Sequence, residues 1–110
     1  MTSTQEQKEL EFLGDSLKRL RDFPDDAKQA AGYQLDRIQN GKMPSDFKPM
    51  KTVGAGVYEI RIHEDNGEFR VFYVATIGDV VYVLHCFQKK DAETPKKDID
   101  LGRTRYKEIA

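Results

Sequence analysis

The chain has 110 residues, of which 34% are charged and one is a cysteine, and its net charge is −1. This length suits one domain, which can fold without disulfide bonds, and the single cysteine, Cys86, excludes both an intramolecular disulfide and a cysteine-based zinc site. The charge balance lacks the basic excess that nucleic-acid-binding proteins usually show, although residues 89–110 hold seven basic and five acidic side chains.

The N-terminal segment, residues 1–7, is polar, and we expect it to be flexible and to precede one domain over residues 8–110. It lacks the apolar segment of a signal peptide, and no stretch of the chain has the roughly 20 apolar residues that span a membrane. A single cysteine also suits a reducing compartment. We therefore expect a cytoplasmic protein with no membrane partner.

A strand and a short helix are expected first. Lys8–Leu13 alternates polar and apolar residues, as a short edge strand does, although the start of a helix also fits. Asp15 suits the N-cap of a helix that carries apolar residues about every three positions. This helix is expected to end at Phe23–Pro24, because the residue before proline avoids the helical conformation.

A longer helix is expected next, starting at Asp25 or Asp26 and ending at Asn40–Gly41, where glycine suits the residue after a helix. Its apolar side chains recur at helical spacing, at Ala27, Ala30 or Ala31, Leu35 and Ile38. Met43–Gly56 is rich in proline and glycine and is expected to connect this helix to the strands.

Three strands are expected in the second half of the chain. Val57–Ile62 and Phe69–Ala75 alternate polar and apolar residues, and Val80–Phe87 is almost wholly apolar, as a central strand is. Asn66–Gly67 and Gly78–Asp79 are turn sequences that would connect the three strands as an antiparallel meander.

A closing helix is expected after Thr94 and Pro95, which suit its cap and its first position. Its apolar face would be formed by Ile99, Leu101 or Gly102, Tyr106 and Ile109. These elements predict an α+β fold. It combines a twisted antiparallel sheet, made of the three-stranded meander with the first strand as a further member, with two N-terminal helices and a C-terminal helix on one face.

The strand patterns also predict a group of charged and aromatic side chains on one face of the sheet. Alternate residues of a strand share a face, so Glu59, Arg61 and Arg70 project away from the apolar residues of their strands. If the apolar residues meet the helices, these three side chains lie on an open face of the sheet. The other members of the expected group lie in or after the neighbouring strands: Phe72, Phe87, Lys89 and Lys90.

This group is suited to RNA. Arginine and lysine can hold a scissile phosphate and stabilise the charge of the transition state, and exposed aromatic rings can stack on unpaired bases. A glutamate near the 2′-hydroxyl, such as Glu59, could act as general base. Charges that alternate with apolar residues also occur on any solvated sheet face, so the pattern by itself leaves both interpretations open.

Structural roles are expected for the remaining reactive side chains. His63, at a strand end beside acidic residues, is expected on the surface, and His85, in the most apolar strand, is expected to be packed and hydrogen-bonded. Cys86 points away from its neighbour His85 and is expected in the core. No metal site is expected, because the two histidines are far apart and have no partners at ligand spacing.

Several segments occur in an order and spacing typical of one protein family: Phe23–Asp26, Gly32–Leu35, Phe47–Met50, Val57–Arg61, Phe69–Tyr73, Val83–Lys90, Thr94–Pro95 and Arg103. With these segments, the chain resembles the phage-derived, HigB-like branch of the RelE/ParE toxin superfamily. The resemblance implies the RelE fold and a type II toxin that cleaves messenger RNA, commonly in the ribosomal A site. It implies attack of the 2′-hydroxyl on the adjacent phosphate with no metal or other cofactor. It also implies a cognate antitoxin with a helix-turn-helix DNA-binding domain as partner.

The resemblance points to the same residues as the strand patterns do. In RelE-like enzymes, active-site residues match the segment Glu59–Arg61, Arg70, and Lys89 or Lys90. We therefore expect catalytic roles for Glu59, Arg61, Arg70 and Lys90, and RNA-binding roles for Lys89, Phe72 and Phe87. Glu59 stands where RelE has a basic residue, and no residue matches the acid of some relatives securely, so the general base and the leaving-group acid stay open.

Two other functions remain open. A toxin of the same fold could inhibit gyrase, as ParE-like members of the superfamily do, or a phage-derived module could bind a protein partner and catalyse nothing. The expected cluster of two arginines and two lysines favours the nuclease.

Overall fold

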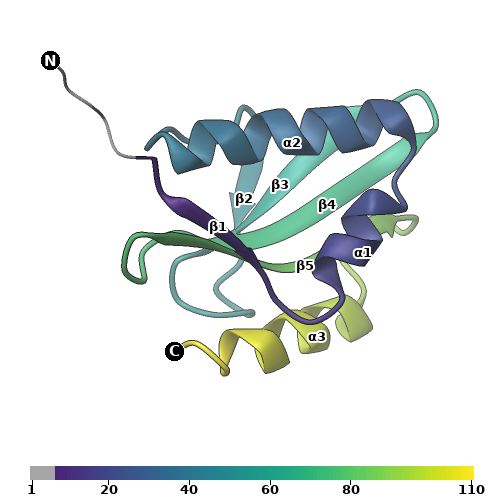
Figure 1. Ribbon diagram of the computed structural model, residues 1–110. Helices are drawn as coiled ribbons and strands as arrows, with labels where there is room; N and C mark the ends of the chain where they lie inside the picture. The colour runs from purple at the N-terminus through teal and green to yellow at the C-terminus, as the bar shows by residue number, and fades with distance from the viewer. Residues whose placement is uncertain (1–6) are drawn as a thin grey trace, which may run out of the picture.

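The computed structural model describes residues 7–110, which form a five-stranded sheet with helices on both faces (Figure 1). The elements in chain order are β1 (Glu9–Phe12), α1 (Ser16–Arg21), α2 (Asp25–Gln39), β2 (Phe47–Pro49), β3 (Val57–Glu64), β4 (Gly67–Val74), β5 (Val80–Lys89) and α3 (Lys96–Tyr106). The predicted α+β class is confirmed. The segment predicted to be flexible, residues 1–7, lies outside the described residues except for Gln7. Over residues 7–110, no helix is long and apolar enough to cross a membrane.

The sheet has the strand order β1-β5-β4-β3-β2. β1 runs parallel to β5, and the other neighbouring strands are antiparallel. The predicted meander is confirmed as β3, β4 and β5, and the strand expected within Lys8–Leu13 is β1. β2 was not predicted, because it is three residues long and lies in the segment expected to be a connector. It ends at Pro49, which donates no backbone hydrogen bond and is therefore suited to a sheet edge.

Two apolar cores lie on opposite faces of the sheet. α1 and α2 cover one face and α3 lies against the other (Figure 1). The core under α1 and α2 includes Ala27, Leu35, Ile60, Val71 and Val83. The core under α3 includes Met50, Val53, Val57, Phe72 and Leu84. The prediction that all helices share one face is therefore wrong.

Gly102 lets α3 pack closely against the sheet. A Cβ atom placed on this glycine lies 2.9 Å from Cδ2 of Phe72 and 3.0 Å from Cγ1 of Val53, which is closer than packed carbon atoms normally approach. Phe72 is consequently 0% exposed. The alternation of strand residues correctly places Phe72 on the face opposite α2, but it does not indicate that α3 covers part of that face.

The expected ends of α2 are confirmed, and Asp15 is the N-cap residue of α1, as predicted. α2 begins at Asp25 and is followed by Asn40 and by Gly41, whose φ is +83°. Asp15 precedes α1, but it makes no capping hydrogen bond with its side chain. Its carboxylate instead accepts hydrogen bonds from Arg19 Nε at 2.9 Å and from Arg105 Nη2 at 2.6 Å.

Arg105 connects α3 both to the sheet and to the start of α1. Its Nη1 donates a 2.9 Å hydrogen bond to the carbonyl oxygen of Leu84, a residue of β5 that the pairing with β4 skips. Hydrogen bonds from Arg19 and Arg105 lower the pKa of Asp15 to about 2. The half of α3 that contains Arg105 is thus fixed by charge-assisted hydrogen bonds as well as by apolar packing.

Candidate functional site

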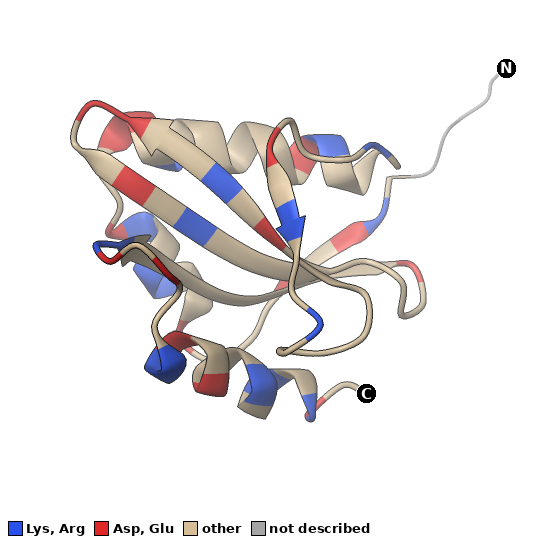
Figure 2. Cartoon of the chain, turned by 180° about the vertical axis from the view of Figure 1, so that it is seen from behind, with Lys and Arg blue, Asp and Glu red and all other residues tan. Residues whose placement is uncertain are grey.

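A cavity of about 520 Å³ lies on the α3 side of the sheet, beside the edge formed by β2 and β3. Its walls come from β2, β3, the end of β5, α3 and two loops, and Figure 2 shows basic and acidic residues beside one another on β2, β3 and β4. The lining residues are Lys48, Pro49, Met50, Lys51, Thr52, Glu59, Arg61, Lys89, Ala92, Glu93, Thr94 and Ile99. Three predicted site residues, Glu59, Arg61 and Lys89, therefore meet in one cavity.

Four cationic side chains line this cavity, together with two carboxylates. Lys48 and Lys51 come from β2 and the loop after it, Arg61 from β3, and Lys89 from the last position of β5. None of the three lysines takes part in a salt bridge within residues 7–110. These ammonium groups are therefore available to an anionic ligand.

Arg61 lies directly opposite a second arginine, Arg70, in the pairing of β3 with β4. Like charges in this arrangement repel each other. Carboxylates compensate only in part: Arg61 Nη1 lies 4.0 Å from Asp46 Oδ1, and Arg70 Nη2 lies 3.2 Å from Glu68 Oε1. The Nε atoms of both arginines are buried and have no hydrogen-bond partner among the described residues. Arg61, the member of the pair that lines the cavity, is thus suited to bind an anion such as phosphate.

Glu59 and Arg70 are buried, with exposed fractions of 1% and 3%, so the expectation that they lie on an open face is wrong. The segment before α3 contacts Glu59: the hydroxyl of Thr94 donates a 2.9 Å hydrogen bond to Glu59 Oε2. The other carboxylate oxygen, Oε1, lies 3.8 Å from Arg70 Nε. Thr94 therefore contacts the site and does not cap α3, whose N-cap is Pro95.

His63 is exposed, as predicted, but it has contacts that the sequence did not indicate. Its Nε2 lies 2.6 Å from Asp46 Oδ2 and its Nδ1 lies 2.7 Å from Glu68 Oε1. Hydrogen bonds to Asp46 and then to Glu68 are the main causes that raise the pKa of His63 above its ordinary value. His63 therefore lies between the two carboxylates that contact Arg61 and Arg70.

Lys90 does not line the main cavity, although it was predicted to share the site with Lys89. It lines a separate cavity of about 250 Å³, together with Arg19 and Lys97. Consecutive residues of an extended chain point in opposite directions, which separates Lys89 from Lys90 at the end of β5. The predicted catalytic role of Lys90 is therefore not supported by its position.

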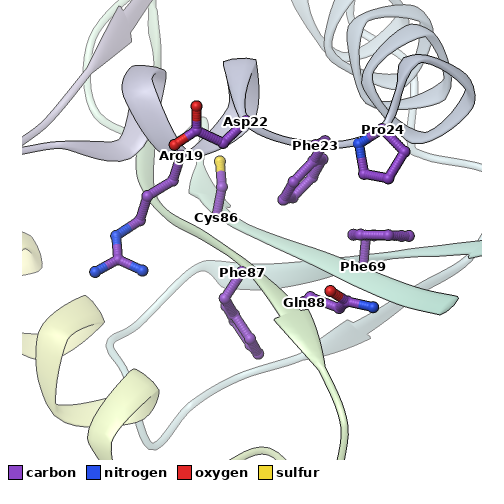
Figure 3. A pocket seen from close by; sticks show the side chains of 8 residues that line it. All are labelled: Arg19, Asp22, Phe23, Pro24, Phe69, Cys86, Phe87 and Gln88. Carbon is purple, nitrogen blue, oxygen red and sulfur yellow. The ribbon is translucent and has the colours of Figure 1, made fainter.

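The two predicted aromatic residues are buried beneath α3. Phe72 belongs to the second core, and Phe87 is 5% exposed, with its ring 5.3 Å from that of Phe72 and 5.1 Å from that of His85. The edge of Phe87 reaches a cavity of about 210 Å³ that Arg19 also lines (Figure 3). The expectation of exposed rings for base stacking is wrong, because α3 and the neighbouring rings cover them.

A comparison of the sequence with models of protein families finds a match. The family model described as "Phage derived protein Gp49-like (DUF891)" matches residues 18–107, about four fifths of the chain. The chain belongs to this family. Gp49-like proteins are known as a RelE-like group of toxins from toxin–antitoxin systems, so the predicted superfamily is confirmed at this level. No curated protein matches the sequence.

The matched range of the Gp49-like family contains every residue of the main cavity. It also contains His85 and Cys86, whose predicted packing is confirmed, since both are fully buried. His85 Nε2 lies 2.7 Å from Asp98 Oδ1, and burial is the main cause that lowers the pKa of His85. Burial likewise raises the pKa of Cys86 to about 12, which keeps its thiol neutral and unreactive.

Within residues 7–110, no group of three or more histidine, cysteine, aspartate and glutamate side chains is arranged to hold a metal ion. Asp46 and Glu68 contact the two opposite nitrogens of the His63 ring. The three side chains are therefore close together but do not converge on one point, as metal ligands would.

Sequence reasoning missed Lys48, Lys51, Asp46 and Glu68 as members of this Gp49-like site. The first three lie in or beside β2, within the segment expected to be a connector. Glu68 lies on the same strand face as Arg70, so the alternation of strand residues could have identified Glu68 as a member of the site. In the register of β4 with β5, Glu68 stands opposite Lys89, which places it beside the site. Finding β2 would have required its pairing with β3 to be known.

Proposed function

We propose that this Gp49-like protein is a HigB-like toxin of a type II toxin–antitoxin system and a metal-independent endoribonuclease that cuts messenger RNA. The observation that carries this proposal is the pair Arg61 and Arg70, which stand opposite each other in the strand register beside a cavity lined by further cations. Within the described part of the chain, the Nε atoms of both arginines make no hydrogen bond. The like charges of the two arginines repel each other in the free protein, and a phosphate bound at Arg61 in the cavity relieves this repulsion.

The reaction is attack of the 2′-oxygen of one nucleotide on the adjacent phosphorus, with release of the 5′-oxygen of the next nucleotide. Arg61, Lys48 and Lys51 hold the phosphate at the cavity wall, and Arg70 adds positive charge from beneath. Because negative charge grows on the phosphate oxygens in the transition state, these fixed cations lower the barrier. The products are a 2′,3′-cyclic phosphate and a 5′-hydroxyl end.

Proton transfer is assigned to two groups in the cavity. Glu59 Oε1 accepts the proton of the 2′-hydroxyl, while Oε2 is held by Thr94. Lys89 supplies a proton to the leaving 5′-oxygen, since its ammonium group lies in the same cavity and has no salt-bridge partner in the described part of the chain. Thr94 acts as a positioning residue, because it fixes the orientation of the carboxylate.

The partners follow from the charge distribution and from the family. Cations concentrate at one cavity while the net charge of the chain is −1, which suits a messenger RNA that the ribosome already holds in place. A toxin also needs a cognate antitoxin, for which we propose a protein with a helix-turn-helix DNA-binding domain. Both partners, and a cytoplasmic location, belong to this proposal.

Induced expression in a bacterial host tests the function. Wild type, Arg61→Gln and Arg21→Gln are compared, since Arg21 is exposed on α1 and lies outside the cavity. Growth should stop, with new messenger RNA 5′ ends inside coding regions, for wild type and Arg21→Gln but not for Arg61→Gln. Growth arrest with intact messages would favour a toxin such as a gyrase inhibitor, and normal growth with soluble wild-type protein would favour a protein-binding module.

A further inference from the structure

His63 lies at the centre of a chain of polar contacts that runs between the two arginines of the site. On one side its Nε2 contacts Asp46, whose other oxygen lies 4.0 Å from Arg61 Nη1. On the other side its Nδ1 contacts Glu68 Oε1, the same oxygen that lies 3.2 Å from Arg70 Nη2. Asp46 and Glu68, the two carboxylates of this chain of contacts, are therefore both bound to His63.

Both ring nitrogens of His63 lie within hydrogen-bond distance of a carboxylate oxygen. A carboxylate only accepts hydrogen bonds, so both contacts are hydrogen bonds only when both nitrogens carry a proton, and this geometry favours the imidazolium form of the ring. The two carboxylates raise the pKa of His63, which agrees with this geometry. The imidazolium therefore provides one positive charge between two negative ones.

We propose that protonated His63 is a positioning residue that occupies Asp46 and Glu68 and thereby leaves Arg61, the arginine that lines the cavity, available to the phosphate of single-stranded RNA. This inference rests on the proposed function, because it assigns to the same site the condition under which it binds RNA. His63 does not line the main cavity. It acts through the carboxylates and not on the substrate.

Loss of the proton reverses this arrangement. One ring nitrogen then presents a lone pair to a carboxylate, so either Asp46 or Glu68 loses its partner and is repelled. The released carboxylate turns to the nearest cation, which is Arg61 for Asp46 and Arg70 for Glu68.

Two other cations lie on the same face and compete less directly for the released carboxylate. In the strand register Lys48 on β2 stands opposite Glu59, and Lys89 on β5 stands opposite Glu68, but neither lysine forms a salt bridge within residues 7–110. Because the folded protein raises the pKa of His63, this loss of RNA affinity occurs as the pH rises through that raised value, above the ordinary pKa of about 6.5.

The experiment measures the affinity for a short RNA oligonucleotide that is fully 2′-O-methylated, which cannot be cleaved because its 2′-oxygens carry no proton. Binding is measured from about pH 6 to about pH 9 for wild type, His63→Gln and His63→Lys. Gln is neutral over this range, whereas Lys remains a cation. Wild-type affinity should fall about tenfold as the pH rises, which is the effect of removing one charge-assisted hydrogen bond between an arginine and the phosphate.

The two variants separate positioning from a purely structural role. His63→Gln should bind about tenfold more weakly than wild type at low pH, with little dependence on pH, and His63→Lys should bind tightly over the whole range. The melting temperature of each variant, measured at the same pH values, reports folding. The other histidine, His85, is fully buried and is present in all three proteins, so it contributes equally.

Two results would overturn the inference, and they differ in what else they affect. Equal pH dependence in wild type and His63→Gln would contradict the role of His63 while the proposed function stands. Absence of binding by all three proteins at every pH, in folded protein, would contradict the proposed function together with this inference.

Discussion

Arg61 and Arg70 occupy directly opposed positions on β3 and β4, so two arginines stand side by side in the sheet, Arg61 in the wall of the cavity and Arg70 buried next to it. A folded protein gains no stability from such a pair. The arrangement is instead favourable for an anion, and the strongest consequences of the proposed function follow from it.

The substitution Arg61→Gln should separate activity from stability. RNA cleavage should fall by about 100-fold or more, because the transition state is deprived of a charge-assisted hydrogen bond to the phosphate. The free energy of unfolding should stay within about 0.5 kcal/mol of wild type, since Arg61 is partly exposed, its contact with Asp46 is long and its repulsion by Arg70 is relieved. Cleavage assays and denaturant unfolding measure the two quantities. A loss of activity that is accompanied by unfolding would contradict the assignment.

Lys89 and Lys90 form a matched pair for testing the boundary of the site. Lys89→Gln should reduce cleavage about tenfold or more, whereas Lys90→Gln should change it less than about twofold, because only Lys89 lines the main cavity. Both substitutions remove one positive charge from neighbouring positions, so a general electrostatic effect would weaken both variants equally. Rates at saturating substrate distinguish the two outcomes.

Arg105→Ala should destabilise the fold by about 2–3 kcal/mol, because it leaves the carbonyl of Leu84 without its charged donor and removes a partner of Asp15. Arg103→Ala, an exposed position on the same helix, should change the free energy of unfolding by less than about 0.5 kcal/mol. Denaturant unfolding of the two variants gives the comparison. Equal effects would mean that the buried hydrogen bonds of Arg105 contribute nothing.

Gly102→Ala should also destabilise the protein, by about 1–3 kcal/mol, since the added methyl group would press against Phe72 and force α3 away from the sheet. Gly32→Ala is the control, because Gly32 lies in α2 with open space where a Cβ would stand. That change should stabilise the protein by about 0.5–1 kcal/mol through the higher helix propensity of alanine. Opposite signs in thermal unfolding are the expected result.

The parity of strand residues predicted most of what can be known of this site from the sequence. It correctly separated Glu59, Arg61 and Arg70 from the residues that pack under α2, because a period of two depends only on local backbone geometry. A tight turn between β3 and β4 was likewise predictable, since it depends on a few adjacent residues, although its two residues are Asp65 and Asn66, one position before the predicted Asn66–Gly67.

The parts that were missed depend on contacts between distant segments. Neither the position of α3 on the second face nor the pairing of β2 with β3 has a local sequence signal. Because α3 was expected on the other face, Phe72 and Phe87 were interpreted as exposed rings. Because β2 was not expected, Asp46 and its bond to His63 were not anticipated.

The central claim is that the 2′-oxygen of the RNA attacks the adjacent phosphate in the cavity between β2, β3 and the end of β5. The most direct measurement adds purified protein to a cell-free translation reaction, with a message that carries a single 2′-deoxy nucleotide immediately before a mapped cleavage position. We predict that cleavage of the unmodified message leaves a 2′,3′-cyclic phosphate and a 5′-hydroxyl, and that the deoxy substitution abolishes the cut at that position alone. Continued cleavage at the deoxy position, or ends that carry a 5′-phosphate, would contradict the account.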